Sequence, residues 1–264
     1  MGNNVSANTL FHFTRSLENL ESILRYEFHP RYCLEDHRMF SPGFWLDSYL
    51  ERAIPMVCFC DIPLSHITKH ADVYGGYAIG LSKEWGEEKN ISPMMYASAT
   101  SSSTAAIKES FRHVLKNLQG EPSGPAESYK KIGFLLDSFL TYTKPYKGED
   151  SRTRTEKVFY DEREWRFVPD PEQRTALGLP LGLYKNEFFD DTTREQANAK
   201  VAEHFKLSFQ PKDIKYIIVN KEEEILPMFG KIEAIKGVNP NYDWDDVRLL
   251  ATRIISLDQI LSDF

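Results

Sequence analysis

Three separated segments hold the residue types that could do chemistry. Segment 10–14 reads LFHFT, segment 52–77 begins with an arginine and ends in YGGY, and segment 162–167 reads EREWRF. In a regular strand, the two glutamates and the second arginine of the third segment would share one face. That face is either exposed to solvent, where ion pairs contribute little, or the floor of a polar cleft. A carboxylate in such a cleft could stabilise a developing positive charge or accept a proton.

Several familiar site motifs are absent from the sequence. There is no GxxxxGK[ST], GxGxxG, HExxH, GxSxG or CxxC pattern, which argues against P-loop, dinucleotide-dehydrogenase, zinc-protease and α/β-hydrolase classes. Cys58, Cys60, His66 and His70 could in principle form a zinc site, but the CxC spacing fits such sites loosely. Two small buried cysteines on a strand are the favoured interpretation. We therefore expect no metal.

The elements that must position these residues mix strands and helices. Apolar runs predict strands at 9–13, 54–60 and 77–81, and Ser16 is expected to cap a helix after the first of them. The strands and helices do not alternate with the regularity of βαβ units. We therefore predict an α+β fold in which residues 1–264 form a single domain.

The middle of the chain predicts a helical insertion at about 104–142. Two amphipathic stretches flank the loop Gly120–Pro125, which reads GEPSGP. Residues 143–157 follow as a polar segment with charges of both signs, which predicts an exposed loop. Residues 159–168, FYDEREWRFV, are expected to form a strand.

The composition predicts a globular protein of the cytoplasm. Of the 264 residues 41% are hydrophobic, enough for a sizeable core, and the net charge is −7, which argues against wholesale binding of nucleic acid but not against a local basic groove. Three cysteines indicate a reducing compartment. No apolar run approaches the ~20 residues of a membrane span. The N-terminal MGNNVS fits the myristoylation pattern, but no basic stretch follows it. We expect no signal peptide and no membrane attachment.

Two resemblances to known families rest on these segments. LFHFTRSLENLESIL resembles the first strand and helix of DarT-type toxin ADP-ribosyltransferases, which begin with a His-x-Thr strand and an NLxxIL helix, and IPMVCFCDIP resembles their second strand. The chain as a whole resembles the AbiGi family of phage abortive-infection proteins over most of residues 9–230, through the HFT start, YGGYAIGLSKEWG and FYDEREWRFVP. AbiGi proteins are conventionally labelled antitoxins.

The resemblance implies an ADP-ribosyltransferase fold, in which two small antiparallel sheets pack across each other with NAD⁺ in the cleft between them. Cleavage of the nicotinamide–ribose bond passes through an oxocarbenium-like state that a carboxylate can stabilise without a metal. By motif position, the catalytic roles fall on Glu164, His12 and Tyr77. The NAD⁺-binding roles fall on His12, Phe13, Thr14, Arg52, Tyr74 and Tyr77, with Tyr96 as a further candidate for stacking on nicotinamide.

The segment 143–157 is the expected acceptor-binding loop. Its basic residues outnumber its acidic ones, which suits the phosphate backbone and stacked base of a single strand. The residues expected to hold the acceptor are Lys144, Tyr146, Lys147, Arg152 and Arg154. Together these features predict an antiphage toxin that modifies a base of RNA or single-stranded DNA and is restrained by a co-encoded antitoxin. The alternative is a catalytically silent antitoxin that neutralises a partner toxin.

Overall fold

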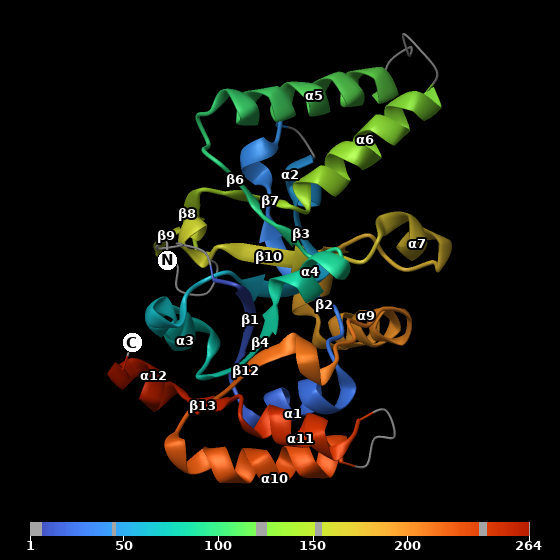
Figure 1. The fold of residues 1–264 in the computed structure, drawn as a ribbon. Coiled ribbons are helices and arrows are strands. Elements are labelled where there is room, and N and C mark those ends of the chain that lie inside the picture. Colours follow the sequence, from blue (N-terminus) through green and yellow to red (C-terminus); the bar gives the residue numbers. More distant parts are fainter. Residues whose placement is uncertain (1–6, 44–45, 120–125, 151–154, 238–241, 264) are drawn as a thin grey trace.

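A nine-stranded sheet runs through the computed structural model, which describes residues 7–43, 46–119, 126–150, 155–237 and 242–263 (Figure 1). The strand order is β13-β12-β4-β1-β3-β10-β5, and β2 and β11 also pair with β3. Two further pairs, β6 with β7 and β8 with β9, lie outside this sheet. The strands are β1 (Thr9–Thr14), β2 (Arg31–Asp36), β3 (Glu51–Cys60), β4 (Tyr77–Ser82), β5 (Ser92–Pro93), β6 (Met95–Ala97), β7 (Thr143–Pro145), β8 (Lys147–Glu149), β9 (Glu156–Val158), β10 (Glu164–Phe167), β11 (Leu183–Tyr184), β12 (Ile214–Val219) and β13 (Ile254–Ser256).

Helices surround the sheet on several sides (Figure 1). The α-helices are α1 (Leu17–Tyr26), α2 (Leu46–Leu50), α3 (Thr68–Tyr74), α4 (Lys83–Glu88), α5 (Ser102–Gln119), α6 (Ala126–Leu140), α7 (Pro171–Ala176), α8 (Lys185–Phe189), α9 (Asp191–His204), α10 (Ile225–Lys236), α11 (Trp244–Ala251) and α12 (Leu257–Asp263). Short 3₁₀ helices are η1 (Arg38–Phe40), η2 (Leu64–His66), η3 (Phe159–Glu162), η4 (Pro211–Asp213) and η5 (Glu222–Glu224). The α+β prediction is confirmed.

The long strand β3 joins what the sequence predicted as two separate sheets. Its first half pairs with β2, and its second half pairs with β10 and, through Phe11 and Cys60, with β1. The strands therefore form one continuous sheet rather than two separate ones, and the ADP-ribosyltransferase fold stays a prediction. The predicted antiparallel pairing holds for most strands, but β12 with β13 and β6 with β7 pair in parallel.

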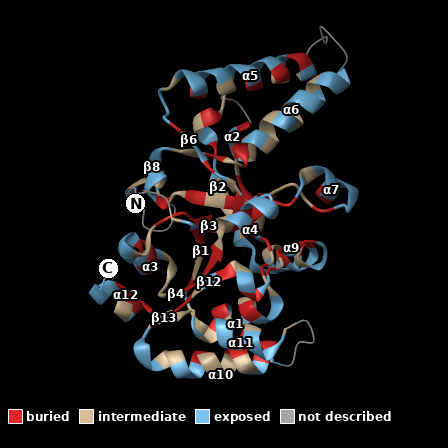
Figure 2. Cartoon of the chain, in the orientation of Figure 1, coloured by how far each residue is buried: buried red, intermediate tan, exposed pale blue. Residues whose placement is uncertain are grey.

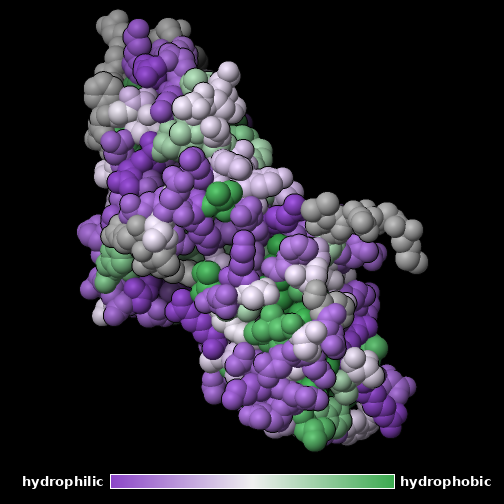
Figure 3. All heavy atoms as spheres, turned by 90° about the vertical axis from the view of Figure 1, so that its left-hand side faces the viewer, coloured by the Kyte–Doolittle hydropathy of each residue, from purple (hydrophilic) through white to green (hydrophobic). Residues whose placement is uncertain are grey.

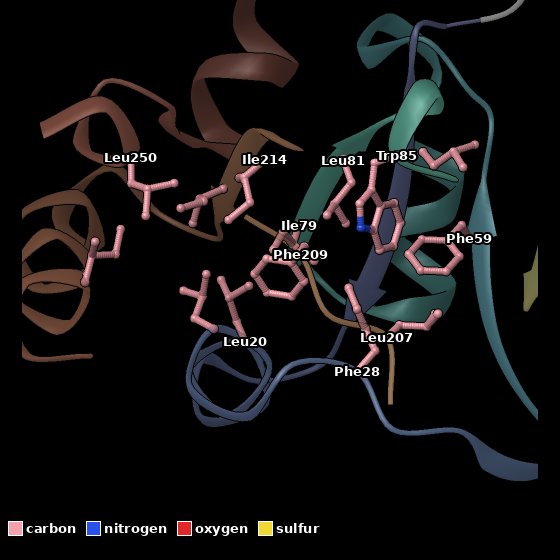
Figure 4. Packing of buried hydrophobic residues seen from close by; sticks show 14 of the residues in the cluster. Leu20, Phe28, Phe59, Ile79, Leu81, Trp85, Leu207, Phe209, Ile214 and Leu250 are labelled. Carbon is pink, nitrogen blue, oxygen red and sulfur yellow. The ribbon is translucent and has the colours of Figure 1, made fainter. Parts of the chain in front are cut away.

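The two faces of the β1 region bury different apolar clusters. One face carries Leu10 and Ile79 and is covered by α1, α10 and α11 in the largest cluster (Figure 4). The opposite face carries Phe11 and Ala78 and is covered by α3 and α12. Buried residues accordingly concentrate along the strands, whereas the outer sides of the helices are exposed (Figure 2). The surface in Figure 3 is mainly hydrophilic, with small hydrophobic groups between.

The predicted helical insertion is present as α5 and α6, which extend away from the sheet (Figure 1). We call this pair the helical arm. Phe111 and Leu140 anchor it in a cluster with Phe40 and Leu50. The predicted loop Gly120–Pro125 lies outside the described residues.

Several local signals have the expected effect, and others do not. Ser16 caps α1 by accepting a hydrogen bond from the Asn19 N–H, as predicted. The predicted loop at 143–157 instead contains strand β7 and the β8–β9 pair. The predicted strand at 159–168 begins with η3 and becomes a strand only at Glu164, because Arg163 adopts a left-handed conformation with φ 43°.

Candidate functional site

Six charged side chains from five elements meet near the start of β10, and we call them the charge cluster. Its members are Glu35, Lys144, Lys157, Glu162, Glu164 and Arg166. Arg166 is fully buried, and Glu162 and Glu164 are nearly so. Of the two alternatives for this charged face, exposure to solvent is therefore excluded, and the face lies in a buried polar region. Three carboxylates face three cations, and this balance offsets the cost of removing so many charges from water.

Glu164 has both carboxylate oxygens engaged by cations. Arg166 Nε donates to Oε1 at 2.5 Å, while Lys144 Nζ and Arg166 Nη2 donate to Oε2 at 2.9 and 3.1 Å. Its backbone N–H donates to the Tyr96 hydroxyl at 2.9 Å. Burial alone would raise the pKa of Glu164, but the charges of Arg166 and Lys144 outweigh burial and hold that pKa well below its usual range.

Lys144 bridges the two central glutamates. From β7, its ammonium donates to Glu162 Oε2 at 2.8 Å and to Glu164 Oε2 at 2.9 Å. Burial would lower the pKa of Lys144, yet the surrounding carboxylates of Glu164, Glu35 and Glu162 raise it well above its ordinary value. Lys144 is therefore a largely enclosed, permanently charged centre of the charge cluster.

Glu162 connects the charge cluster to α3. Tyr74 donates its hydroxyl hydrogen to Glu162 Oε1 at 2.5 Å, and Lys157 Nζ lies 2.7 Å from the same oxygen. Burial and the Glu162 charge raise the pKa of Tyr74, which stays protonated. His70 lies against Tyr74 with ring centroids 5.9 Å apart, and its buried Nε2 has no hydrogen-bond partner among the described residues. Burial lowers the pKa of His70.

Within the charge cluster, each carboxylate is occupied by neighbouring cations. A general base works best with a pKa near the working pH, whereas Glu164 shares its lone pairs with two cations and has a lowered pKa. The arrangement ties β2, β7, β9, η3 and β10 together through ion pairs. These ion pairs hold the polar side chains of the region in a fixed arrangement.

The structure does not bring His12 together with Glu164. Phe11 pairs with Cys60, and Cys60 pairs with Glu164, so these three side chains share one face of the sheet. His12 is the next residue along β1 and points to the opposite face. There its ring packs against Phe28 at 5.2 Å between centroids, and Nδ1 lies 2.8 Å from the Cys58 carbonyl oxygen. Burial lowers the pKa of His12.

Tyr77 and Thr14 lie opposite each other on neighbouring strands, on the same sheet face as His12. The Tyr77 hydroxyl donates to Glu224 Oε1 at 2.8 Å, and β4 is three strands from β10, about 14 Å across the sheet at the usual strand spacing. Phe13 faces the other way, into the cluster with Phe11. Of the predicted tyrosines, only Tyr74 and Tyr96 reach the charge cluster.

Arg52 lies in a different environment from the charge cluster. Its guanidinium forms an ion pair with Asp137 of α6 and stacks on the Tyr49 ring, 4.1 Å from the centroid. It is buried.

The predicted acceptor residues divide into three groups. Lys144 is enclosed in the charge cluster and cannot present its charge to a strand of nucleic acid. Tyr146 and Lys147 are exposed, and Lys147 is 3.5 Å from Glu156. Arg152 and Arg154 lie outside the described residues.

The predicted zinc alternative has no counterpart in the described part of the chain, where no group of three or more His, Cys, Asp or Glu side chains could hold a metal ion. No helix in the described ranges is both long and apolar enough to cross a membrane.

Sequence reasoning missed Glu35, which pairs with Arg166 at 2.9 Å from strand β2. It also treated Lys157 as a loop residue rather than as a partner of Glu162. The one available signal for Glu35 is an acidic residue directly after the apolar run at 32–34, which occurs too often to identify a site.

The strands and helices make this a mixed α+β protein. Its sequence matches abortive phage resistance proteins. A family model described as "Putative abortive phage resistance protein AbiGi, antitoxin" matches residues 26–220, so the chain belongs to the AbiGi family. The chain is 28% identical over 230 residues to the abortive phage resistance protein AbiGi of Lactococcus lactis subsp. cremoris, covering 80% of this chain and 89% of that protein. No solved structure matches the chain.

The family assignment corrects the predicted function. The AbiGi resemblance is confirmed, but neither comparison shows the DarT-type resemblance. Because the family is described as an antitoxin, the prediction of a toxin that modifies nucleic acid is wrong, and the expected partner is a toxin rather than an antitoxin. The NAD⁺ and transferase predictions that accompanied it have no support in these comparisons.

Proposed function

We propose that this protein is the antitoxin of an abortive-infection pair and neutralises its toxin by binding it directly. The observation that carries the proposal is the antitoxin description of the family whose model matches residues 26–220. Abortive infection requires that the toxin be held inactive in healthy cells. A folded protein that covers the toxin is the simplest device for this.

The arrangement of the predicted catalytic residues supports a binding role rather than a catalytic one. Glu164 accepts hydrogen bonds from Arg166 and Lys144 on both of its oxygens. His12 and Tyr77 lie on the opposite face of the sheet. A single substrate in one cleft could not touch all three groups.

The helical arm offers a surface for the toxin. Ile132, Leu135 and Phe139 of α6 are 43%, 56% and 43% exposed, and their spacing places them along one side of the helix. Grouped exposed apolar side chains on a helix are typical of protein–protein contact sites. We infer that the toxin covers this stripe.

Basic residues on the helical arm indicate what kind of toxin surface would bind it. Lys108, Arg112 and Lys116 of α5 follow one another at intervals of four residues, which aligns them along the helix. The whole chain has a net charge of −7, so this basic row stands out from an acidic protein, although Arg112 also pairs with Glu109 of the same helix. The expected toxin surface is an apolar groove with acidic residues at its rim.

The test is co-expression of the chain with the toxin encoded beside its gene. Expression of the chain alone should leave growth unchanged, and co-expression should restore growth that the toxin stops. A toxin carrying an affinity tag should retain the chain on a column. If the chain alone stops growth, or if rescue occurs without any physical association, direct neutralisation is wrong.

A substitution series locates the contact. Leu135→Asp should abolish rescue and co-purification, because a buried unpaired charge would be placed in the interface. Leu226→Asp is the matched control, since Leu226 is 79% exposed on α10 and away from the arm. Both variants should melt close to the wild-type temperature, because surface substitutions usually change stability by less than about 0.5 kcal/mol. Equal loss of rescue in both variants would contradict the arm as the contact.

A further inference from the structure

A cavity lies where α6 meets the segment that follows β10. Its volume is about 40 Å³, and its walls include Arg52, Asp137, Ser138, Thr141 and Arg174. The residues come from β3, α6, the α6–β7 connection and α7. The charge cluster and the proposed toxin surface use none of these side chains, so the cavity has no assigned role.

Arg174 supplies a buried positive charge without a carboxylate partner. The residue is 2% exposed. Its Nε donates to the Pro169 carbonyl oxygen at 3.1 Å, and its Nη1 donates to the carbonyl oxygens of Pro180 and Leu181 at 3.3 and 2.8 Å. Among the ion pairs formed by the described residues, none involves Arg174. Carbonyl oxygens satisfy hydrogen bonds but do not neutralise a guanidinium, which remains costly to bury.

Arg52 supplies a second guanidinium at the same cavity. It is 5% exposed and its charge is matched by one carboxylate, Asp137. Two arginines and one aspartate leave the cavity walls with a net charge of +1. Within a chain of net charge −7, this is a local excess of positive charge.

The remaining walls can adapt to such a ligand. Ser138 and Thr141 carry hydroxyl groups that donate to the carbonyl oxygens of Phe134 and Ser138, and a hydroxyl can rotate to donate elsewhere. One water needs ~10–15 Å³ in a cavity of this kind, so 40 Å³ has room for one small polyatomic ion and not for a whole nucleotide.

We propose that this cavity binds a single phosphate-sized oxyanion, held between the guanidinium groups of Arg52 and Arg174. Planar guanidinium groups match the oxygens of phosphate with paired hydrogen bonds. The anion would neutralise the charge that Arg174 now carries alone. Asp137 faces the same space and limits the attraction, so the expected affinity is in the millimolar range. This proposal is independent of the antitoxin function.

The experiment measures thermal unfolding of the full chain with inorganic phosphate, against sodium chloride at equal ionic strength. For a dissociation constant near 1 mM, 10 mM phosphate should favour the folded state about elevenfold. That corresponds to a rise of a few degrees in melting temperature. The ³¹P resonance of phosphate should also broaden with added protein. A parallel titration with AMP distinguishes free phosphate from the phosphoryl end of a nucleotide, and binding of either supports the proposal.

Two variants and their controls make the test specific. Arg174→Met should remove the phosphate response, whereas Arg112→Met on the exposed side of α5 should keep it. Arg174→Met could fail to fold, so Ser138→Leu provides a second variant that fills the cavity and leaves both arginines in place. Ser128→Leu, at an exposed position of the same helix, is its control.

The outcomes decide the proposal in either direction. Loss of the phosphate response in Ser138→Leu but not in Ser128→Leu supports it. No response of the wild-type chain to phosphate beyond that to chloride overturns it. An equal phosphate response in Ser138→Leu overturns it as well, because the anion would then bind elsewhere.

Discussion

Lys144 shows how one residue can be misjudged from its neighbours in the sequence. It stands in a polar segment rich in charge, where a lysine is normally a solvated surface group. In the structure its ammonium lies between Glu162 and Glu164, and its side chain is 14% exposed. Its charge is therefore matched by two carboxylates within the protein, which favours a role in stability.

We predict that Lys144→Met destabilises the protein strongly. Removal of one member of a buried ion pair leaves an uncompensated charge and typically costs about 3–5 kcal/mol. Urea unfolding followed by circular dichroism gives the free energy of unfolding. The control is Lys147→Met, three positions away, where the side chain is 57% exposed and the expected change is below about 0.5 kcal/mol. Similar losses in the two variants would contradict the buried role.

We predict that the free energy of unfolding falls in mild acid because of His37. Its ring is buried, Nε2 donates to the Thr143 carbonyl oxygen at 3.1 Å, and burial lowers the pKa of His37 to about 4. Between the ordinary value of 6.5 and about 4, the unfolded chain binds a proton here and the folded chain does not. Stability therefore falls as the pH is lowered through this window, by about 3 kcal/mol in total.

The measurement is the free energy of unfolding at a series of pH values from 7 to about 4. His37→Gln should be less stable at pH 7 but should lose less on acidification than the wild type. His204→Gln, at an exposed position near the end of α9, should retain the wild-type slope. A wild-type slope in His37→Gln would show that another group causes the acid sensitivity.

At the scale of elements, the connection between α3 and β4 depends on one glycine. Gly75 has φ +114°, and a Cβ there would lie 2.3 Å from the Thr14 carbonyl oxygen and 2.5 Å from Arg15 Cα. The backbone at Gly75 therefore lies in close contact with the end of β1, at Thr14 and Arg15. Only glycine permits both the conformation and the distance.

We predict that Gly75→Ala destabilises the protein by about 3 kcal/mol or more, because strain and steric overlap add. Gly178→Ala is a graded control: Gly178 also has positive φ, at +67°, but no atom lies within 4 Å of the added Cβ. That change should cost only about 1–2 kcal/mol. Thermal unfolding of both variants measures the difference. Equal effects would mean that backbone conformation alone, and not the contact with Thr14, matters at Gly75.

Strands and helices that are marked by apolar runs or by a capping residue were predictable from the sequence. The apolar runs of β1, β3 and β4 and the Ser16 cap of α1 are read directly from residue spacing. The β8–β9 pair was not, because its strands are short and polar and depend on their contacts for their shape.

The candidate site was predictable only in part. The side chains of Glu164 and Arg166 share one face, as their spacing suggested, whereas Glu162 belongs to η3 and joins them through Lys144. His12 faces away from Glu164 because of the register between β1, β3 and β10. A shift of that register by one residue would place the two side chains on the same face. Such a register is fixed by long-range packing and cannot be read from any one segment.

At the scale of the whole molecule, the continuous sheet predicts cooperative unfolding. The apolar clusters on its two faces share β1, β4 and β12, and β3 connects them to the region under the arm. Disruption of one cluster therefore removes support from the others. Far-UV circular dichroism and tryptophan fluorescence should give the same urea midpoint, since Trp85 lies in the largest cluster. Two separated midpoints would indicate that residues 1–264 do not form a single cooperative domain.

The ends of the sheet decide how the protein behaves when it accumulates. The outermost strand β5 has two residues, one of them a proline, and β13 at the other end has three. The outer side of β2 is occupied by α9, where Asn198 accepts a hydrogen bond from the Tyr32 N–H at 2.8 Å. Long unpaired strand edges are templates on which further copies polymerise. Because the described edges are short, blocked by proline or covered, a surplus of this protein would not assemble into fibrils through its sheet and would remain dispersed. Under the proposed antitoxin function, that surplus would stay ready to capture newly made toxin.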